Sequence, residues 1–210
     1  VTSANDVTLN DSGAIDFGVS TISGNLSVTA AGDITNSGAL NVTGTTTLAA
    51  GSGNDILLDG DNRFGGAVSV TSADDVTLNE TVAIDLGAST ISGNLAVTAN
   101  GAITDSGALN ITGTTTLDGL DITLDSANDF GGAVLITTGR NVTLNDTGAI
   151  DLGTASISGN LSVTAAGDIT DSGSLTITGT TTLAAGSGND ILLDAANQFG
   201  GAVSVTSADD

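Results

Sequence analysis

The stretch "ISGNLAVTANGAITDSG" (Ile91–Gly107) decides the fold of this chain. Apolar and polar residues alternate in it, so Leu95 and Val97 share one face of an extended strand. Gly, Asn, Asp and Ser, which form tight turns easily, border the alternating part. Two neighbouring segments, "FGGAVSVTSADDVTLN" from Phe64 and "ITGTTTLDGLDITLDS" from Ile111, follow the same order of glycine, alternating stretch, polar break and second alternating stretch. The chain is therefore built from segments of one kind.

These segments are grouped into longer repeats. The sequence "VTSANDVTLN", which begins at Val1, recurs in related form from Val70 and from Ile136, and its first half recurs from Val205. The middle copy is shorter because "TTTLAAGSGNDILLD" is replaced in it by "TTTLDGLDITLD". The pattern predicts one continuous solenoid over residues 1–210, an excerpt of a longer repeat protein. Its units are residues 1–69, 70–135, 136–204 and the start of a fourth at 205–210.

Each unit divides into three segments, of 27, 20 and 19 residues in the middle unit and with a last segment of 22 residues in the others. A repeat near 20 residues suits one coil of a parallel β-solenoid, which buries a core only by stacking on its neighbours. We expect an all-β, single-stranded parallel β-helix, right-handed, with about nine coils and a length of roughly 43 Å at ~4.8 Å per coil. The long first segment predicts a bulged loop or an extra strand in "SGAIDFGVST".

Two other folds compete with the solenoid. A helical fold is disfavoured because the apolar period is two and β-branched residues and Gly are dense. A string of immunoglobulin-like sandwiches is disfavoured because such domains usually need ~100 residues and a bulky core. Only 2% of the residues of this chain are aromatic, which does not fit a bulky sandwich core.

The alternation also predicts which side chains point inward. Leu57 aligns with Thr123 of the middle unit and should face outward, while Ile56 and Leu58 should face inward. The Phe residues at equivalent positions of the three units should fill a wide corner of the core. The residues that we expect to form the core include Val68, Val70, Val76, Leu78, Leu95, Val97, Ile122, Leu124 and Phe130.

The amino-acid composition argues against several classes of binding partner. The chain has 24 acidic and 2 basic residues and a formal net charge of -22, which argues against nucleic acid and against docking on an anionic bilayer. No apolar run approaches the ~20 residues of a membrane span, so we expect no membrane insertion. Without Cys there can be no disulfide. We expect the acidic residues to lie in solvated turns that keep a long rod soluble.

The stretch "ISGNLSVTAAGDITNSGALNVTG" (Ile22–Gly44) resembles the repeats of filamentous-haemagglutinin-like large exoproteins, and the resemblance covers all three units. Those proteins are exported bacterial adhesins with right-handed parallel β-helical shafts. The resemblance implies an extracellular or cell-surface location and a fibrous, structural role. It implies no catalytic residues. The expected partners are neighbouring repeats of the same parent chain, with self-association into fibres as a further possibility.

The stretch "GSGNDILLDGD" (Gly51–Asp61) matches the core of the nonapeptide calcium-binding β-roll. Calcium needs six to eight oxygens from successive turns. Here the match occurs only at Gly51 in the first unit and at Gly186 in the third, and it is missing from the middle copy, so a simple turn is the favoured interpretation. The candidates for a calcium ion at a lateral loop are Asp55, Asp59, Asp61, Asp190 and Asp194.

Two further activities are weighed and set aside. Polysaccharide chemistry on a β-helix would need a base and charge-stabilising cations beside paired carboxylates. Arg63 and Arg140 occupy different positions in the repeat, so we expect no enzyme and no cofactor. The "TGTTTL" runs return once per unit, which is too rare for an ice-binding face; their hydroxyls should meet neighbouring coils or water. The leading hypothesis is a rigid shaft of an exported adhesin, surface fibre or extracellular filament, and the alternative is a calcium- or glycan-binding module.

Overall fold

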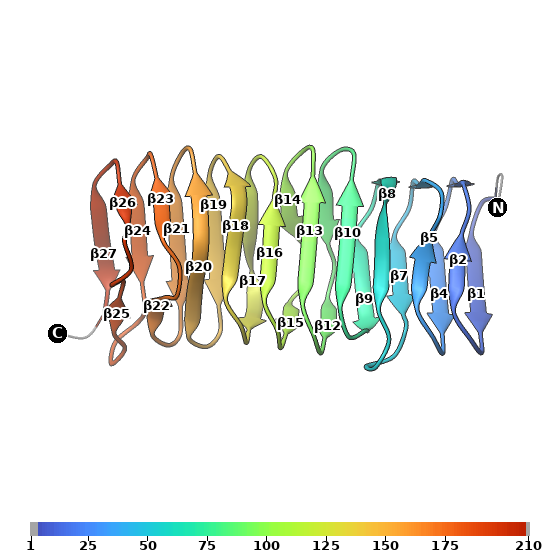
Figure 1. Ribbon diagram of the computed structural model, residues 1–210, viewed down its shortest axis with the longest axis horizontal. Coiled ribbons are helices and arrows are strands. Elements are labelled where there is room, and N and C mark those ends of the chain that lie inside the picture. The colour runs from blue at the N-terminus through green and yellow to red at the C-terminus, as the bar shows by residue number, and fades with distance from the viewer. Residues whose placement is uncertain (1–3, 209–210) are drawn as a thin grey trace.

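The computed structural model describes residues 4–208 as two parallel β-sheets wound from one chain around a single core (Figure 1). All described regular structure is strand, in about ten turns. The predicted all-β parallel solenoid is therefore confirmed. The described part contains no helix long and apolar enough to cross a membrane.

The strands fall into three groups of nine that follow the three copies of the repeat. The first group is β1 (Val7–Asp11), β2 (Ile15–Phe17), β3 (Ser20–Ile22), β4 (Leu26–Ala30), β5 (Ile34–Asn36), β6 (Leu40–Val42), β7 (Thr46–Ala49), β8 (Ile56–Phe64) and β9 (Val68–Ser72). The second group is β10 (Val76–Glu80), β11 (Ile84–Leu86), β12 (Ser89–Ile91), β13 (Leu95–Ala99), β14 (Ile103–Asp105), β15 (Leu109–Ile111), β16 (Thr115–Asp118), β17 (Ile122–Phe130) and β18 (Val134–Gly139). The third group is β19 (Val142–Asp146), β20 (Ile150–Ile157), β21 (Leu161–Ala165), β22 (Ile169–Asp171), β23 (Leu175–Ile177), β24 (Thr181–Ala184), β25 (Ile191–Leu192), β26 (Gln198–Phe199) and β27 (Val203–Ser207).

Two long sheets form the layers of the solenoid. One follows the order β1-β4-β7-β9-β11-β14-β17-β19-β21-β24-β27, and the other follows β2-β5-β8-β10-β13-β16-β18-β20-β22-β25. Every pairing is parallel, because each strand stacks on the strand one turn earlier. Short strands such as β3 and β6 pair at the side of the solenoid, where the chain bends from one layer to the other.

The repeat unit does not coincide with a whole number of turns. From Val7, three successive register pairings lead to Val68 in the same sheet. Val76, the repeat equivalent of Val7, opens β10 in the opposite sheet. The next unit behaves alike: three pairings lead from Val76 to Val134, and Val142 lies back in the first sheet. One unit therefore makes three and a half turns, and equivalent residues of successive units alternate between opposite faces.

This half turn corrects the predicted count of about nine coils, which assumed three coils per unit. The 27-residue segment that begins at Phe64 holds the three strands β9, β10 and β11, whereas the 20-residue segment that begins at Ile91 passes through β13 and β14 before the next head. The predicted extra strand is therefore present and adds half a turn to each unit. At ~4.8 Å per turn, ten turns give a rod of roughly 48 Å.

The core lies between the two layers and is built from aliphatic residues that recur at every second position. All nine predicted core residues are buried, and Leu57 is 40% exposed between the buried Ile56 and Leu58. Phe64 and Phe130 are buried at equivalent corners, whereas Phe199 is only half-buried on the last turn. The inward and outward assignments made from the repeat are confirmed.

The prediction that the hydroxyls of the threonine runs contact neighbouring coils or water holds for only some of these threonines. The Thr45 hydroxyl lies 3.0 Å from Asn25 Oδ1 of the preceding turn, as expected of a contact between coils. The central residue of each run, Thr46 and its equivalents Thr115 and Thr181, is buried, and its Oγ1 has no hydrogen-bond partner among the described residues. These threonines fill core positions by their methyl groups, since the strand alternation turns them inward.

Candidate functional site

The "GSGND" stretch forms a turn that carries its own hydrogen bonds. Gly51 has a φ of 91°, a left-handed conformation that favours glycine. Asn54 donates its backbone N–H to the Gly51 carbonyl at 3.1 Å and its side-chain amide to the Ala50 carbonyl at 2.8 Å. In the third unit Asn189 makes the second of these bonds with Ala185, also at 2.8 Å. Gly51 and the asparagine are thus explained by turn geometry.

The five calcium candidates do not converge on one point. All five are exposed, and Asp59 and Asp61 follow each other along β8 at outward positions. The backbone N–H groups of Asp190 and Asp194 donate to carboxylates of the preceding turn, those of Asp168 and Asp171, at 2.9 Å each. Among the described residues, no group of three or more acidic side chains is arranged to hold a metal ion.

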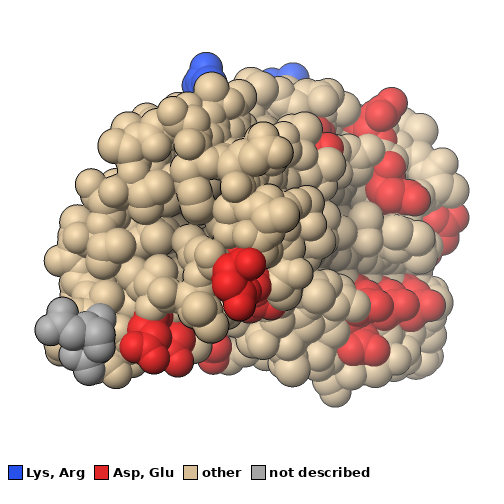
Figure 2. Space-filling model, turned by 60° about the vertical axis from the view of Figure 1, so that its left-hand side comes forward, with Lys and Arg blue, Asp and Glu red and all other residues tan. Residues whose placement is uncertain are grey.

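Asp55 instead belongs to a ladder of carboxylates at the starts of strands. The Asp55 N–H donates to Asp33 Oδ1 at 3.0 Å, and the Asp75 N–H donates to Asp55 Oδ1 at 3.1 Å. The Asn94 N–H continues the ladder to Asp75 Oδ1 at 2.7 Å. A residue just before a parallel strand directs its N–H along the solenoid axis, so a short carboxylate on the preceding turn can accept it. Figure 2 shows acidic side chains gathered in such rows on the surface.

A shallow groove of about 280 Å³ runs beside this ladder. It is lined by Asp33, Thr35, Asp55, Ile56, Leu57, Asp75 and Thr77. Each of its three carboxylates already accepts a backbone N–H from the next turn. The two arginines of the chain lie outside the lining, so the groove offers no cation to stabilise a developing negative charge. Its chemistry is that of a solvated acidic surface.

The one ion pair among the described residues bridges two turns at the surface. Arg140 donates from both Nε and Nη2 to the Asp121 carboxylate, and the Asn141 N–H donates to the same group at 3.2 Å. The hydrogen bond from Arg140 is the main reason why the pKa of Asp121 falls to about 2. The pair is exposed, so its contribution to stability is small.

Two carboxylates contradict the expectation that the acids are solvated turn residues. Glu80 and Asp146 are 1% and 2% exposed, at equivalent positions of β10 and β19. Glu80 Oε2 accepts the Phe64 N–H at 2.8 Å, and Asp146 Oδ2 accepts the Phe130 N–H at 3.1 Å. Each closes a corner of the solenoid where the preceding long strand ends in its phenylalanine. We call these the Glu80 corner (Asn62, Phe64, Glu80) and the Asp146 corner (Asn128, Phe130, Asp146).

A buried asparagine supports each corner from the preceding turn. Asn62 Oδ1 accepts the Leu40 N–H at 2.9 Å, and its amide donates to the Leu58 carbonyl at 3.0 Å. Asn128 Oδ1 accepts the Leu109 N–H at 2.8 Å. Both asparagines are fully buried. Their side chains replace backbone partners at the bend, where the ladder between adjacent turns shifts register.

Burial changes the acidity of both corner carboxylates. It raises the pKa of Glu80 from 4.5 to about 7, against the lowering effect of backbone hydrogen bonds such as that from Phe64. It also raises the pKa of Asp146, with the Gly148 and Phe130 N–H groups opposing. Glu80 Oε1 is buried without a partner in the described structure. In both corners, the carboxylate accepts hydrogen bonds from backbone N–H groups.

Comparison with protein families identifies the repeat. A family model described as "Repeats of unknown function (DUF5649)" matches residues 4–71, 73–137 and 139–206. The chain belongs to the DUF5649 repeat family. No curated protein and no solved structure matches this chain. Each matched stretch corresponds to one copy of the unit that makes three and a half turns.

The corner residues of these DUF5649 repeats were missed by sequence reasoning, although a signal was present. Each repeat has an Asn two residues before its Phe, at 62, 128 and 197, and an acid directly after "VTLN", at 11, 80 and 146. The recurrence could have singled them out. Alternation alone also placed the acid with the inward residues Val76 and Leu78, but its charge suggested exposure.

Proposed function

We propose that this DUF5649 segment is a rigid shaft in a large exported bacterial protein, serving as an adhesin stalk, surface fibre or extracellular filament. The observation that carries the proposal is the unbroken parallel stacking from β1 to β27 around one core. Each turn is hydrogen-bonded to the next through the backbone, so the rod resists bending along its whole length. The export and the adhesive role are supported by the resemblance of "ISGNLSVTAAGDIT" (Ile22–Thr35) to exoprotein repeats.

The surface fits this role. The net charge of -22 is carried mainly by exposed aspartates, several of which also cap the N–H groups that open strands. A high charge of one sign keeps long rods soluble and apart. Our proposal assigns the chain no reaction, no cofactor and no nucleic-acid partner. The calcium- or glycan-binding alternative has less support, because the candidate aspartates are spread along strands and loops.

The length added per repeat tests the shaft proposal. Three and a half turns at ~4.8 Å predict that each added unit lengthens the particle by about 17 Å at constant cross-section. We would measure small-angle X-ray scattering of chains with three, four and five units at low protein concentration. A string of separate domains would give a flexible, beaded profile, and that result would contradict the proposal. A polysaccharide-turnover screen of the same chains should be negative.

Location is tested separately from shape. Fractionation of cells that produce the parent protein, with an antibody against this segment, should find it on the surface or in the medium. Recovery from the cytoplasm alone would overturn export while leaving the rod intact.

A further inference from the structure

The middle unit contains the one Asn-Gly pair of the sequence, Asn100–Gly101, in the turn between β13 and β14. The other units have Ala31–Gly32 and Ala166–Gly167 at this place. Asn100 is exposed, and its side-chain amide forms no hydrogen bond with a described residue. A free asparagine side chain before a glycine is readily attacked by the main chain, because glycine has no Cβ to hinder the approach.

The reaction open to such a pair is a deamidation that consumes only water. The Gly101 nitrogen bonds to the Asn100 Cγ, the Cγ–Nδ2 bond breaks, and the proton of the Gly101 N–H leaves with Nδ2 as ammonia. Water then opens the cyclic imide at either carbonyl, which gives aspartate or isoaspartate. The isoaspartate product carries an additional methylene group in the main chain.

The stacked turns hold the nitrogen that would attack. The Gly101 N–H donates to the Val82 carbonyl of the preceding turn at 3.0 Å. Beside it, the Asn100 N–H donates to the Glu80 carbonyl at 3.1 Å. A Cβ at position 101 would lie 2.5 Å from the Ala83 nitrogen, so the two turns touch through their backbones. The attack removes the hydrogen that Gly101 donates, and this contact must therefore open before the reaction can occur.

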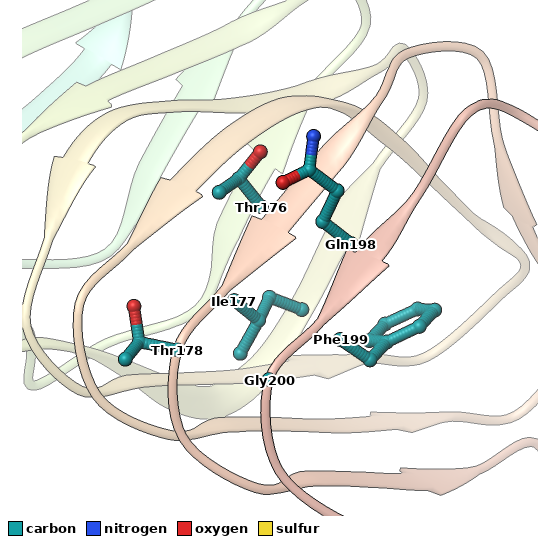
Figure 3. A pocket seen from close by; sticks show the side chains of 6 residues that line it. All are labelled: Thr176, Ile177, Thr178, Gln198, Phe199 and Gly200. Atoms are coloured by element: carbon teal, nitrogen blue, oxygen red, sulfur yellow. The ribbon is translucent and has the colours of Figure 1, made fainter.

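The same kind of hydrogen bond holds a glycine at each phenylalanine corner. Gly200 donates its N–H to the Ile177 carbonyl at 2.7 Å, and Figure 3 shows the two residues side by side. Gly65 and Gly131 form equivalent bonds, also at 2.7 Å. These glycines follow phenylalanine, whereas Gly101 follows the asparagine.

The hydrogen bond to Val82 belongs to the unit that contains the asparagine. In the first and third units, Gly32 and Gly167 form no backbone hydrogen bond of this kind with a described residue. The residue at the place of Val82 also differs there, since it is Gly13 in the first unit and Gly148 in the third. The middle unit therefore combines the reactive pair with the contact that holds its nitrogen.

We propose that Asn100–Gly101 is a deamidation site that the solenoid keeps closed through the hydrogen bond from Gly101 to Val82, so that the modification marks chains in which this turn has come apart. The isoaspartate product cannot restore the contact unchanged, because its longer main chain separates the two N–H groups that bond to Glu80 and Val82. The site depends only on the stacking of the turns, so it is independent of the shaft function.

The rates of deamidation in the folded chain and in urea test the site. Cleavage before aspartate releases residues 85–104, which contain Asn100, and residues 105–117, which contain Asn110. Asn110 is the matched control, because it is exposed and its side chain has no described partner, but Ile111 follows it. Mass spectrometry of samples incubated at neutral pH should find Asn100 modified at least tenfold more slowly in the folded chain than in urea. Equal rates in the two states, or no preference for Asn100 over Asn110 in urea, would overturn the site.

Val82→Gly tests the hydrogen bond without a change at the reacting residues. Glycine stands at this place in the other units, so the variant should fold, which circular dichroism checks. Asn100 should be modified about threefold faster in the folded variant than in the folded parent, and at the same rate in urea. An unchanged rate in the folded variant would refute the role of the bond. The comparison of the two states of the parent stands whether or not this variant folds.

The effect on the fold is tested with the modified chain itself. Chains aged in urea and refolded should melt several degrees below Asn100→Ala chains given the same treatment, because alanine cannot deamidate. Asn100→Asp carries the added charge without the longer main chain, and it should melt close to the parent. A modified chain as stable as Asn100→Ala would show that the turn accepts isoaspartate, and that result would contradict the proposed loss of contact.

Discussion

The Glu80 corner and the Asp146 corner share a backbone path but differ by one methylene group. The shorter Asp146 uses both oxygens, one for the Phe130 N–H and one for the Gly148 N–H. Glu80 bonds the Phe64 N–H through Oε2, and Oε1 stays buried without a partner in the described structure. The same fold therefore tolerates two carboxylates of different length, but only the shorter one is fully hydrogen-bonded.

The asparagines beneath the two corners extend the contrast. Asn62 Oδ1 accepts a hydrogen bond from the neutral Asn36 amide at 2.8 Å. Asn128 instead donates its amide to the Asp105 carboxylate at 2.8 Å. The Asp105 and Asp146 carboxylates thus lie on the turns before and after Asn128, whereas the turn before Asn62 supplies the neutral Asn36. The comparison teaches that the corner needs a hydrogen-bond acceptor for the phenylalanine N–H, whereas the charge at the corner can vary.

The largest effect is expected from a charge placed in the apolar core beside the Glu80 corner. Val97 is buried on β13, which pairs with the strand of Glu80. Val97→Asp would bury an unpaired charge and should lower the free energy of unfolding by about 5 kcal/mol. Urea denaturation followed by circular dichroism measures it. Ala96→Asp, on the outward side of the same strand, is the control; an unchanged midpoint for Val97→Asp would refute the inward assignment.

A somewhat smaller loss of stability is expected when the asparagine beneath either corner is replaced. Asn62→Leu and Asn128→Leu each remove an acceptor from a buried backbone N–H and a donor from a second partner. At ~1–3 kcal/mol for each buried group left unpaired, we expect a loss of about 4 kcal/mol from either change. Asn79→Ala, at a less buried site on β10, is the control in the same denaturation assay. A neutral result at one corner would show that its polar frame is dispensable.

The stability of the chain should depend on pH through the buried Glu80 carboxylate. The pKa of Glu80 is raised from 4.5 to about 7 in the folded state, so its protonated form is favoured by folding. The resulting stabilisation is complete below pH 4.5 and is lost as the pH rises through about 7. This loss is on the order of 3 kcal/mol.

Glu80→Gln tests this dependence, because the amide keeps the shape and cannot ionise. We would compare urea midpoints at about pH 4.5 and about pH 8, on either side of the raised pKa, for the parent and the variant. The variant should lose less stability over this range, with Asp146→Asn measured beside it because burial also raises the pKa of Asp146. Parallel pH profiles for the parent and the Glu80→Gln chain would contradict the effect.

The smallest effect is expected where the units differ away from the corners. Leu57 is exposed and stands where the middle unit has Thr123. Leu57→Thr should change the free energy of unfolding by less than about 0.5 kcal/mol. A buried neighbour, Leu58→Thr, serves as the contrasting control in thermal denaturation. A large loss at position 57 would mean that the outward face also carries part of the packing.

Much of the fold could be predicted because it depends on local patterns. The alternation around Leu95 and Val97 and the comparison of Leu57 with Thr123 predict the correct faces from the residues alone. The "GSGND" turn was also anticipated, since its glycine favours a left-handed conformation. The burial of Glu80 was not anticipated, because a carboxylate after "VTLN" is buried only when the preceding turn supplies the Phe64 N–H beneath it.

The amino-acid sequence by itself determined the strand period, the repeat and the identity of the inward residues, because these depend on side chains a few positions apart. Only the tertiary structure decided that a unit makes three and a half turns, so that successive copies face opposite ways. A break rich in Gly or Asp contains the same residue types whether the chain bends once or twice around the core, so the sequence of the break does not give the number of bends. The number of bends is set by the turn already in place, whose hydrogen-bonding edge and apolar row each new strand must match.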